Sequence, residues 1–482
     1  MEERKGFGST FGFLMASVGS AVGLGNIWGF PKQMGLNGGF TFLIVYLLLA
    51  IFCGLIIMIG ELALGRKTGK GAIASYQKVS KKFKWLGWLA TLSPFLILFF
   101  YCALGGYCIK YFVVNVGNLF GAGFGSNGLD GAGIFGAFMT SPVEGVIFGL
   151  IFVAITMLVV SGGVSGGIEK MCSIGMPALF VMLIVCIIRA VTMDGAVEGL
   201  KFMFQPGYAL EAGFISEAPN LFSVMSNAGG QMFFSLSLGM GVMITYGSYL
   251  SKEDNITKNA IIVVICDTLV ALMAGLCVIP AAVAYQSSQG IANGDMVIGG
   301  PKLLFIAMQN VFDSMGTIGC VFGILFYLLV ILAAVSSSIS LLEVIVAHFA
   351  DKAADAGKGD MRKKFTLIGA AAVAVGCLLI CWDGLGSNGI APFELLNMQA
   401  AGWNDCWLDF FDMLSEGIMM PLGALLMAIM IGWELGPDFT KDEVEVSGHK
   451  FGLYGFYKIC IKVITPLCMI LVLYGQIKAF FF

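Results

Sequence analysis

The chain has 482 residues, of which 58% are hydrophobic and only 12% are charged. That charged fraction is about half of the usual quarter in soluble domains, and the mean hydropathy is +0.91. This composition excludes a soluble globular protein, a disordered chain and a disulfide-rich secreted module. The net charge is only −3, so no nucleic-acid partner is expected. The 13 cysteines are scattered, and we interpret them as small buried hydrophobic residues.

Long apolar segments dominate the chain, and a helix crosses a bilayer in about 20 apolar residues. Eleven candidate segments lie at 10–34, 40–65, 86–118, 144–161, 168–191, 221–250, 259–285, 318–349, 365–382, 409–434 and 454–481. We therefore expect an all-α integral membrane protein with about 11 transmembrane helices. No small-residue cleavage site follows a short apolar core, so the first segment is expected to stay in the membrane.

The loops between these segments differ in charge. Lys and Arg cluster in residues 66–84 and 352–364, whereas residues 119–143 and 383–408 contain neither. Because cytoplasmic loops carry the excess of Lys and Arg, we expect a cytoplasmic N-terminus. Residues 119–143 are rich in glycine and suggest no role. The acidic stretch 436–450, with Asp438, Asp442, Glu443 and Glu445, is interpreted as a solvated loop.

Two of the segments contain glycine or serine runs that weaken a helix. The first has Gly19, Gly23 and Gly25 within seven residues, and the sixth has a similar run at 235–241. Each glycine costs roughly 1 kcal/mol against alanine in a helix interior. A backbone opened there exposes carbonyl groups that lipid cannot satisfy, and a desolvated cation is a good partner for them. The alternative is that the glycines serve close helix packing.

The spacing of the two interrupted segments favours a cation site over close helix packing, because the segments lie five spans apart. Breaks at matching places in two five-helix halves indicate an inverted-repeat transporter with a site near the bilayer midplane. We expect a first repeat at 1–192, a second inverted repeat at 193–435, and a loop with an additional span at 436–482. In such a site, half-helix N-termini face a substrate carboxylate and the freed carbonyls suit Na⁺.

Polar side chains inside other spans are further candidates. Asp267 lies in the seventh span, where an ionised carboxylate costs several kcal/mol unless it is paired. A bound cation would neutralise it. Ser336, Ser337 and Ser338 interrupt the apolar eighth span and either bond to backbone or neighbouring helices or act as oxygen ligands for a cation. Tyr101 in the third span either donates a hydrogen bond to a carboxylate or serves packing.

These residues resemble the bacterial neurotransmitter:sodium symporter family of amino-acid transporters, over nearly the whole chain. The segment 19–31, Gly-Ser-Ala-Val-Gly-Leu-Gly-Asn-Ile-Trp-Gly-Phe-Pro, carries most of the resemblance. Further similar motifs lie at 37–40, 61–66, 167–170 and 231–239. The resemblance implies the inverted-repeat fold with broken helices one and six, a location in the bacterial inner membrane as a multi-pass protein, and a monomer or weak oligomer.

Two Na⁺ sites are implied by the same resemblance. The first Na⁺ would bind the substrate carboxylate and a set of four residues: Ala21, Asn26, Ser235 and Asp267. The second would bind three carbonyl groups and two hydroxyl groups, those of Gly19, Val22, Ala333, Ser336 and Ser337.

The resemblance also implies a substrate site, in which Tyr101 holds the carboxylate and Phe234 forms a lid. Its residues would be Ala21, Gly23, Gly25, Ile97, Tyr101, Leu104, Phe234, Ser235, Ser237, Met240, Ser337, Ser338 and Leu341. Because most of these side chains are apolar, we expect import of a neutral, hydrophobic or aromatic amino acid by alternating access. The protein is not expected to be an enzyme.

Chloride and the gates depend on particular positions. In chloride-dependent members a serine stands four residues after an asparagine in span seven, whereas here these positions are Asp267 and Ala271. The acid supplies the negative charge, so chloride-independent transport is expected. Arg4 and Asp351 match the cytoplasmic ion pair of the family.

The outer gate departs from the family pattern. Gly29 stands where the family has an arginine, and Asp412 matches the acidic partner of that arginine. Lys32, on a neighbouring turn, is a candidate substitute.

Three other classes of function make different demands on the sequence. A channel would need repeated filter loops or a ring of like residues, which this chain does not show. A membrane enzyme would need a catalytic set, but His348 and His449 stand in no such spacing. A proton-coupled transporter, or one for a small solute other than an amino acid, with the same fold, is the alternative that remains open.

Overall fold

The computed structural model describes residues 7–299, 303–393 and 404–481, and its regular elements in that part of the chain are helices. This confirms the all-α prediction. Seven of the expected spans follow the chain without a break in direction: α3–α4 (Phe40–Leu49 and Leu55–Thr68), α6 (Leu86–Phe120), α8 (Pro142–Ser161), α9 (Lys170–Val191), α14 (Ile256–Ser288), α16 (Gly316–Asp355) and α17 (Arg362–Asp383). Two more are α19–α20 (Trp407–Asp412 and Met420–Ile429) and α22–α23 (Tyr454–Ile459 and Thr465–Phe481), each joined by a π-helical turn.

The first span is bent where the glycine run predicts a break. It consists of α1 (Thr10–Ala21), a π-helical turn (Gly25–Gly29) and α2 (Phe30–Leu36), and the two parts meet at 44°. Val22 is extended at the end of α1. The chain therefore leaves the helical path across residues 22–24, inside a segment that is otherwise apolar enough to span a membrane.

The sixth segment is divided even more clearly into α12 (Leu221–Ser235) and α13 (Val242–Gly247). Between them Ser237, Gly239 and Gly241 have positive φ angles of 54°, 75° and 71°. Two of these positions are glycines, which adopt such angles without strain from a Cβ atom. Because neither α12 nor α13 alone is long enough, the described residues contain nine continuous helices of membrane length and the bent pair.

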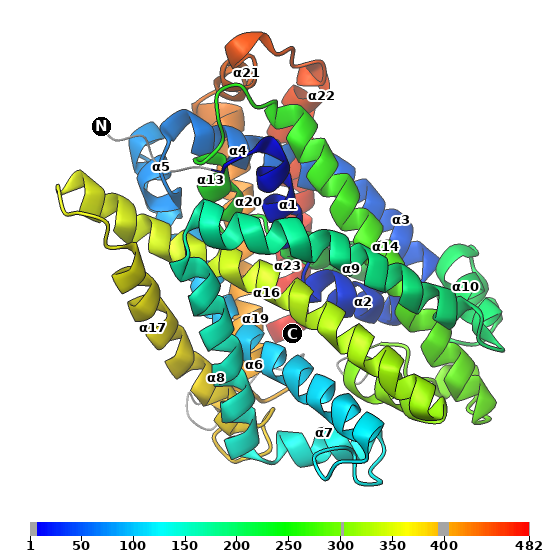
Figure 1. Ribbon diagram of the computed structural model, residues 1–482. Coiled ribbons are helices and arrows are strands. Elements are labelled where there is room, and N and C mark those ends of the chain that lie inside the picture. Colours follow the sequence, from blue (N-terminus) through cyan, green and yellow to red (C-terminus); the bar gives the residue numbers. More distant parts are fainter. Residues whose placement is uncertain (1–6, 300–302, 394–403, 482) are drawn as a thin grey trace.

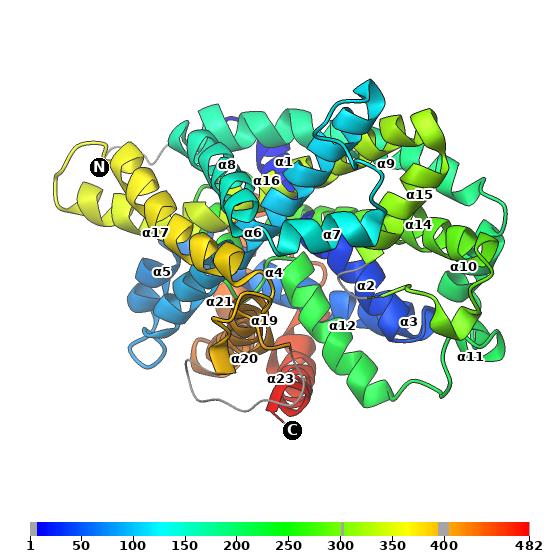
Figure 2. The same ribbon diagram turned by 90° about the horizontal axis from the view of Figure 1, so that it is seen from below.

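The two broken spans lie in the interior of the helix bundle. In Figure 1, α1 and α2 run through the middle of the molecule, where α1 packs against α9 and α16 and α2 packs against α14. The long helices α6 and α16 also pack against each other. Figures 1 and 2 show α17 at one edge and α10 (Ala196–Phe204) at the opposite edge. The repeat boundaries at 192 and 435 stay predictions.

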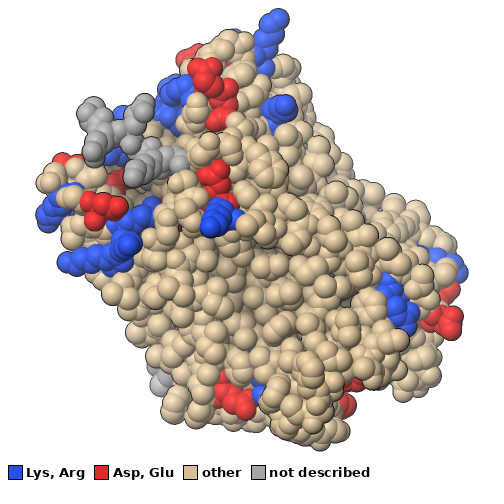
Figure 3. Space-filling model, viewed as in Figure 1, with Lys and Arg blue, Asp and Glu red and all other residues tan. Residues whose placement is uncertain are grey.

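The surface fits a membrane environment. Figure 3 shows charged side chains at the end that carries α5 (Ala72–Val79) and α21 (Asp438–Val444), smaller groups at the opposite end, and a broad uncharged belt between them. Large apolar side chains are exposed on the outer helices, among them Leu158 on α8 and Val375 on α17. Such a contiguous apolar surface is what lipid requires.

The loops expected at 119–143 and 436–450 contain short helices. In the first, α7 (Gly131–Met139) begins at the capping residue Asp130, and the ring of Phe138 packs edge-on against Tyr107 with centroids 4.5 Å apart. Two further short helices are α11 (Tyr208–Glu211) and α15 (Met308–Ser314).

The expectation of a solvated loop at 436–450 is wrong for Glu443. Asp438, Asp442 and Glu445 are exposed, but Glu443 is buried on α21. Arg66, at the end of α4, donates to Glu443 Oε1 over 2.8 Å, and Lys252 donates to the same oxygen over 2.7 Å. The acidic residue therefore joins the connector between the last two spans to the second span.

Replacing Glu443 by Gln tests this pair. The variant leaves the buried Arg66 guanidinium without a counter-charge, which typically costs about 3–5 kcal/mol of folding stability. We expect a clear fall in the unfolding temperature of the detergent-solubilised protein. Asp442→Asn, the exposed neighbour on the same helix, is the matched control and should shift stability by less than about 0.5 kcal/mol. Equal unfolding temperatures for the two variants would contradict the assignment.

Candidate functional site

The two helix breaks meet, and side chains of the sixth segment satisfy backbone carbonyl groups of the first. The Ser237 hydroxyl, from the break between α12 and α13, donates to Ser20 O at the end of α1 over 3.0 Å. Gln231 Nε2 on α12 donates to Gly25 O over 2.7 Å. Carbonyl groups freed by an interruption in lipid need such partners, because no water is there to supply them. The breaks are thus parts of one interior site.

A carboxylate from the second span supports the sixth-span break. Glu61 on α4 is 1% exposed, and its Oε1 accepts a hydrogen bond from Gly239 N over 2.8 Å. A Cβ atom at Gly239 would lie 2.4 Å from the carbonyl oxygen of Met420, so glycine is required there for space as well as for its φ angle. The motif at 61–66 therefore contributes a residue that holds the backbone open at the site.

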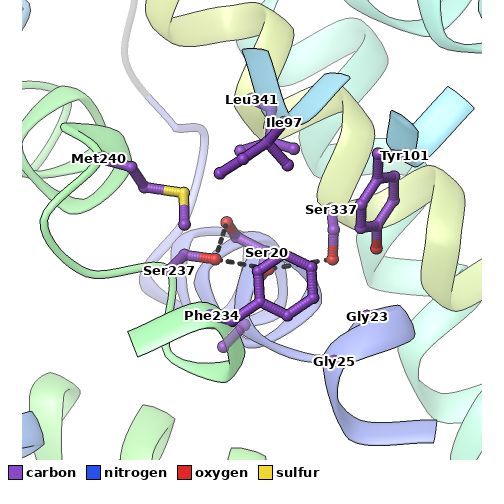
Figure 4. Close-up of a pocket in the computed structure, with 11 residues that line it drawn as sticks. Ser20, Gly23, Gly25, Ile97, Tyr101, Phe234, Ser237, Met240, Ser337 and Leu341 are labelled. Carbon is purple, nitrogen blue, oxygen red and sulfur yellow. Dashed lines mark hydrogen bonds between the residues drawn. The ribbon is translucent and has the colours of Figure 1, made fainter. Parts of the chain in front are cut away.

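A cavity lies where the breaks face α6 and α16 (Figure 4). Ten of the thirteen expected substrate-site residues line it: Ala21, Gly23, Gly25, Ile97, Tyr101, Phe234, Ser237, Met240, Ser337 and Leu341. The lining also includes Ser20, for which the sequence predicts no role. Leu104, Ser235 and Ser338 do not line the cavity; the Ser338 hydroxyl instead pairs with that of Thr156 at 2.8 Å.

Glycine allows the chain to approach closely at the wall of the cavity. A Cβ atom at Gly23 would lie 2.3 Å from Ser337 Oγ and 2.6 Å from the Tyr101 hydroxyl. The Tyr101 hydroxyl accepts a hydrogen bond from Leu24 N over 3.0 Å. The ring of Tyr101 lies 6.3 Å from that of Phe234, measured between centroids. The Leu24 N–H, the phenol of Tyr101 and the ring of Phe234 thus meet at one end of the cavity.

The first expected Na⁺ ligand set gathers around Asp267, which is completely buried. Asn26 Nδ2 donates to Asp267 Oδ1 over 2.7 Å, and the Ser235 hydroxyl lies 2.9 Å from the same oxygen. The hydroxyl of Tyr46, a residue for which the sequence predicts no role, donates to Oδ2 over 3.3 Å. Ala21, the fourth expected member, lines the neighbouring cavity. These partners are neutral, so the carboxylate is hydrogen-bonded but its charge is not balanced by them.

The second expected ligand set brings together hydroxyl groups of α16 and carbonyl groups of α1. The Ser336 hydroxyl lies 2.9 Å from Ala333 O and 3.4 Å from Val22 O. The Ser337 hydroxyl lies 3.4 Å from Gly19 O. These are hard, neutral oxygen donors, and the C-terminal end of a helix adds partial negative charge. The donor set fits an alkali cation such as Na⁺.

The expected cytoplasmic gate is only partly within the described residues. Arg4 lies outside them. Asp351, near the end of α16, accepts a hydrogen bond from Gly71 N over 3.0 Å at the start of α5. The pairing of Arg4 with Asp351 stays a prediction.

At the outer end, a glutamine occupies the space beside the glycine that replaces the family arginine. A Cβ atom at Gly29 would lie 2.6 Å from Gln231 Oε1. Asp412 is hydrogen-bonded to Glu416, and Lys32 is close enough to act on both carboxyl groups electrostatically. Lys32 is thus a cation near the acidic partner, as expected of a substitute, and its role as a gate stays a prediction.

A family model and two relatives of known sequence are similar to this chain. The model of the sodium:neurotransmitter symporter family matches residues 4–119 and 144–481. The sodium-dependent transporter YhdH of Bacillus subtilis is 33% identical over 474 residues, covering 96% of each chain. A sodium-dependent transporter of Methanocaldococcus jannaschii is 30% identical over 98% of this chain and 90% of its own.

A solved structure is also similar to this chain. The crystal structure of MhsT in complex with L-phenylalanine has a TM-score of 0.82 and 32% identity, and the match covers 98% of this chain and 100% of that one. Together with the paired helix breaks, these matches establish that the chain belongs to the sodium:neurotransmitter symporter family.

Proposed function

We propose that this sodium-coupled transporter imports a neutral amino acid with a hydrophobic or aromatic side chain, by alternating access and without chloride. The observation that carries the proposal is the cavity between the two helix breaks, beside which the two expected Na⁺ ligand sets lie. Most of its wall beyond the serines is apolar, with Ile97, Met240 and Leu341 on α6, on the α12–α13 break and on α16. MhsT, a relative of the same fold, was crystallised with L-phenylalanine.

The substrate carboxylate would bind at the end of the cavity where Tyr101 and Leu24 N meet. The partial positive charge of the half-helix that begins at Gly25 favours an anion there. Phe234 would cover the bound amino acid. Since no ionic side chain lines the cavity among the described residues, the substrate side chain would be uncharged.

The first Na⁺ would bind Asn26, Ser235, Asp267, the Ala21 carbonyl and the substrate carboxylate. A buried carboxylate inside a membrane costs several kcal/mol unless an opposite charge accompanies it. Sodium supplies that charge, and the substrate contributes a ligand to the ion. Binding of one therefore strengthens binding of the other by the same factor.

The second Na⁺ would bind the carbonyl groups of Gly19, Val22 and Ala333 together with Ser336 and Ser337. The two serine hydroxyl groups lie within hydrogen-bond distance of these carbonyl oxygens. On loading, the hydroxyl hydrogens would turn away so that the oxygens face the cation. Because α1 and α16 both contribute ligands, the ion would draw the first and eighth spans together.

The driving force follows from charge. One elementary charge that crosses 100 mV gains about 2.3 kcal/mol. Two Na⁺ with a zwitterion carry net charge inward, so uptake would be electrogenic. Rocking of spans one, two, six and seven against the remainder would open the site inward. With Lys and Arg concentrated at 66–84 and 352–364, the N-terminus would be cytoplasmic in a bacterial inner membrane.

Chloride independence rests on Asp267 and Ala271. Asp267 carries the negative charge within 2.9 Å of the Ser235 hydroxyl, and Ala271 offers no oxygen ligand one helical turn later. A second anion in the same buried volume would repel the carboxylate.

Sodium coupling can be tested in proteoliposomes with radiolabelled hydrophobic and aromatic amino acids. Uptake should follow an inward Na⁺ gradient and fall to background without it. Equal uptake in both conditions would reject sodium coupling. Uptake driven instead by a proton gradient would favour the proton-coupled alternative.

The variant Ser336→Ala with Ser337→Ala tests the second ion site. Loss of both hydroxyl oxygens should abolish Na⁺-dependent uptake, because the remaining carbonyl groups cannot complete the coordination. Ser17→Ala is a control of the same chemistry, since Ser17 is buried on α1 and its hydroxyl has no hydrogen-bond partner among the described residues. Full Na⁺-dependent uptake by the double variant would contradict the assignment of this site.

Chloride independence has its own test. Replacing chloride by gluconate on both sides of the membrane should change Na⁺-driven uptake less than twofold, because Asp267 already carries the negative charge. A fall to background in gluconate would contradict the expectation.

A further inference from the structure

A second cavity lies between α9, α14, α15 and α16, near the C-terminal end of α9 and the N-terminal end of α16. Figure 2 shows α9, α14 and α15 in one region of the molecule, and α14 packs against both of the others. The cavity shares no residue with the substrate cavity or with the two sodium ligand sets. Its walls therefore need an explanation of their own.

Sulfur is concentrated in these walls. Five of the eleven lining residues carry it, whereas the 13 Cys and 27 Met make up about one residue in twelve of the whole chain. Apart from Arg189, the other lining residues are apolar. Packing alone does not call for this excess, since leucine or isoleucine fills an apolar gap as well. The sulfur residues come from α9, α14, α15 and the segments that follow α9 and α15: Cys186, Met193, Cys277, Met308 and Met315.

Two thiols and one thioether form the buried part of this group. Cys186 on α9 and Cys277 on α14 are 5% and 2% exposed, and their thiols are close enough to interact. Met308 is buried as well, while Met193 and Met315 are half-buried. Methionine has three rotatable bonds, so its sulfur can turn toward a ligand without movement of the backbone. The half-buried pair thus leads from the surface to the buried sulfur atoms.

The donor set selects the kind of ligand. The described residues contain no group of three His, Cys, Asp or Glu side chains that could hold a metal ion. A zinc site, which is usually built from three or four such ligands, therefore does not fit. Thiolate and thioether ligands together select soft cations, and Cu⁺ is the soft cation that accepts both.

Charge balance supports the same ligand. Because the thiolate is the metal ligand, Cu⁺ displaces one proton from each thiol, and two thiolates with Cu⁺ carry a net charge of −1. The guanidinium of Arg189 lines the cavity and forms no ion pair with any other described residue. It supplies the opposite charge, so the loaded cavity is neutral, as an apolar interior requires.

We propose that this cavity is a Cu⁺ site, in which Cys186 and Cys277 are the thiolate ligands and Met308 supplies a thioether. Met193 and Met315 form the route by which the ion enters. Since one thiolate comes from the fifth span and the other from the seventh, the bound ion ties these two spans together. The inference does not depend on which substrate the protein transports.

Binding is measured on the purified full-length protein without oxygen, with Cu⁺ supplied as its bicinchoninate complex so that only tightly held ions stay bound. The wild type should retain one Cu⁺ per chain, with sulfur as its neighbours in X-ray absorption spectra. Its unfolding temperature should rise with Cu⁺, because a ligand that binds the folded state stabilises it. Cys186→Ser with Cys277→Ser should lose the bound ion and the rise, since a hydroxyl is a hard ligand.

A second thiol pair provides the matched control. Cys377 and Cys381 lie on α17 with their sulfur atoms 3.9 Å apart, and neither lines this cavity. Cys377→Ser with Cys381→Ser should retain the same Cu⁺ as the wild type. Met308→Leu keeps the apolar volume but removes the thioether, so it should release Cu⁺ at a lower bicinchoninate concentration. This variant also serves if the first double variant does not fold.

A wild type that retains no Cu⁺, or that holds it by nitrogen and oxygen alone, would overturn the site. Equal retention by the wild type and the Cys186 and Cys277 double variant would overturn it too, as would equal loss in both double variants. Each of these results leaves sodium-coupled transport standing, because uptake is not the readout.

Discussion

The architecture depends on one constraint: a polypeptide that interrupts a helix within lipid must find partners for the backbone groups it frees. In this protein each interruption finds such partners in the other half of the chain. Ser20 O is held by Ser237 from the opposite break, Gly25 O by Gln231, and Gly239 N by the carboxylate of Glu61. Neither break is stable alone, so the site exists only when both halves of the chain are assembled around it.

The same constraint explains why ionisable groups are found at the centre of so apolar a chain. Glu61 stabilises an open backbone, and Asp267 gathers Asn26, Ser235 and Tyr46 around it. Each carboxylate accepts hydrogen bonds from neutral groups, yet its charge remains a cost in a medium of low dielectric. An interior built in this way favours the binding of a cation, which makes the energetic requirement of the fold and the coupling to sodium the same requirement.

Much of this could be predicted from the sequence, because hydropathy and glycine runs act locally. The spans, the bend near Gly23 and the interruption at 235–241 follow from segments of about 20 residues, and the family motifs identified most of the cavity lining. The contacts of those residues could not be predicted, since Tyr46 stands in no motif, and the motifs that contain Ser20 and Gln231 do not say which group each side chain or carbonyl contacts. Glu443 was misread for the same reason: four acids in a short polar stretch look alike until Arg66, 377 residues away, is placed beside one of them.

That separation between Arg66 and Glu443 bears on how the molecule is made. Ribosomes add about 5–20 residues per second, so the carboxylate emerges roughly 20–75 s after the guanidinium it must neutralise. During this interval the end of the second span has its cation but lacks the anion, and the spans already inserted must wait in the bilayer with that ion pair incomplete. Biogenesis of this transporter is therefore completed from its C-terminal end, and a chain released before the last connector is made leaves an early part of its own structure open.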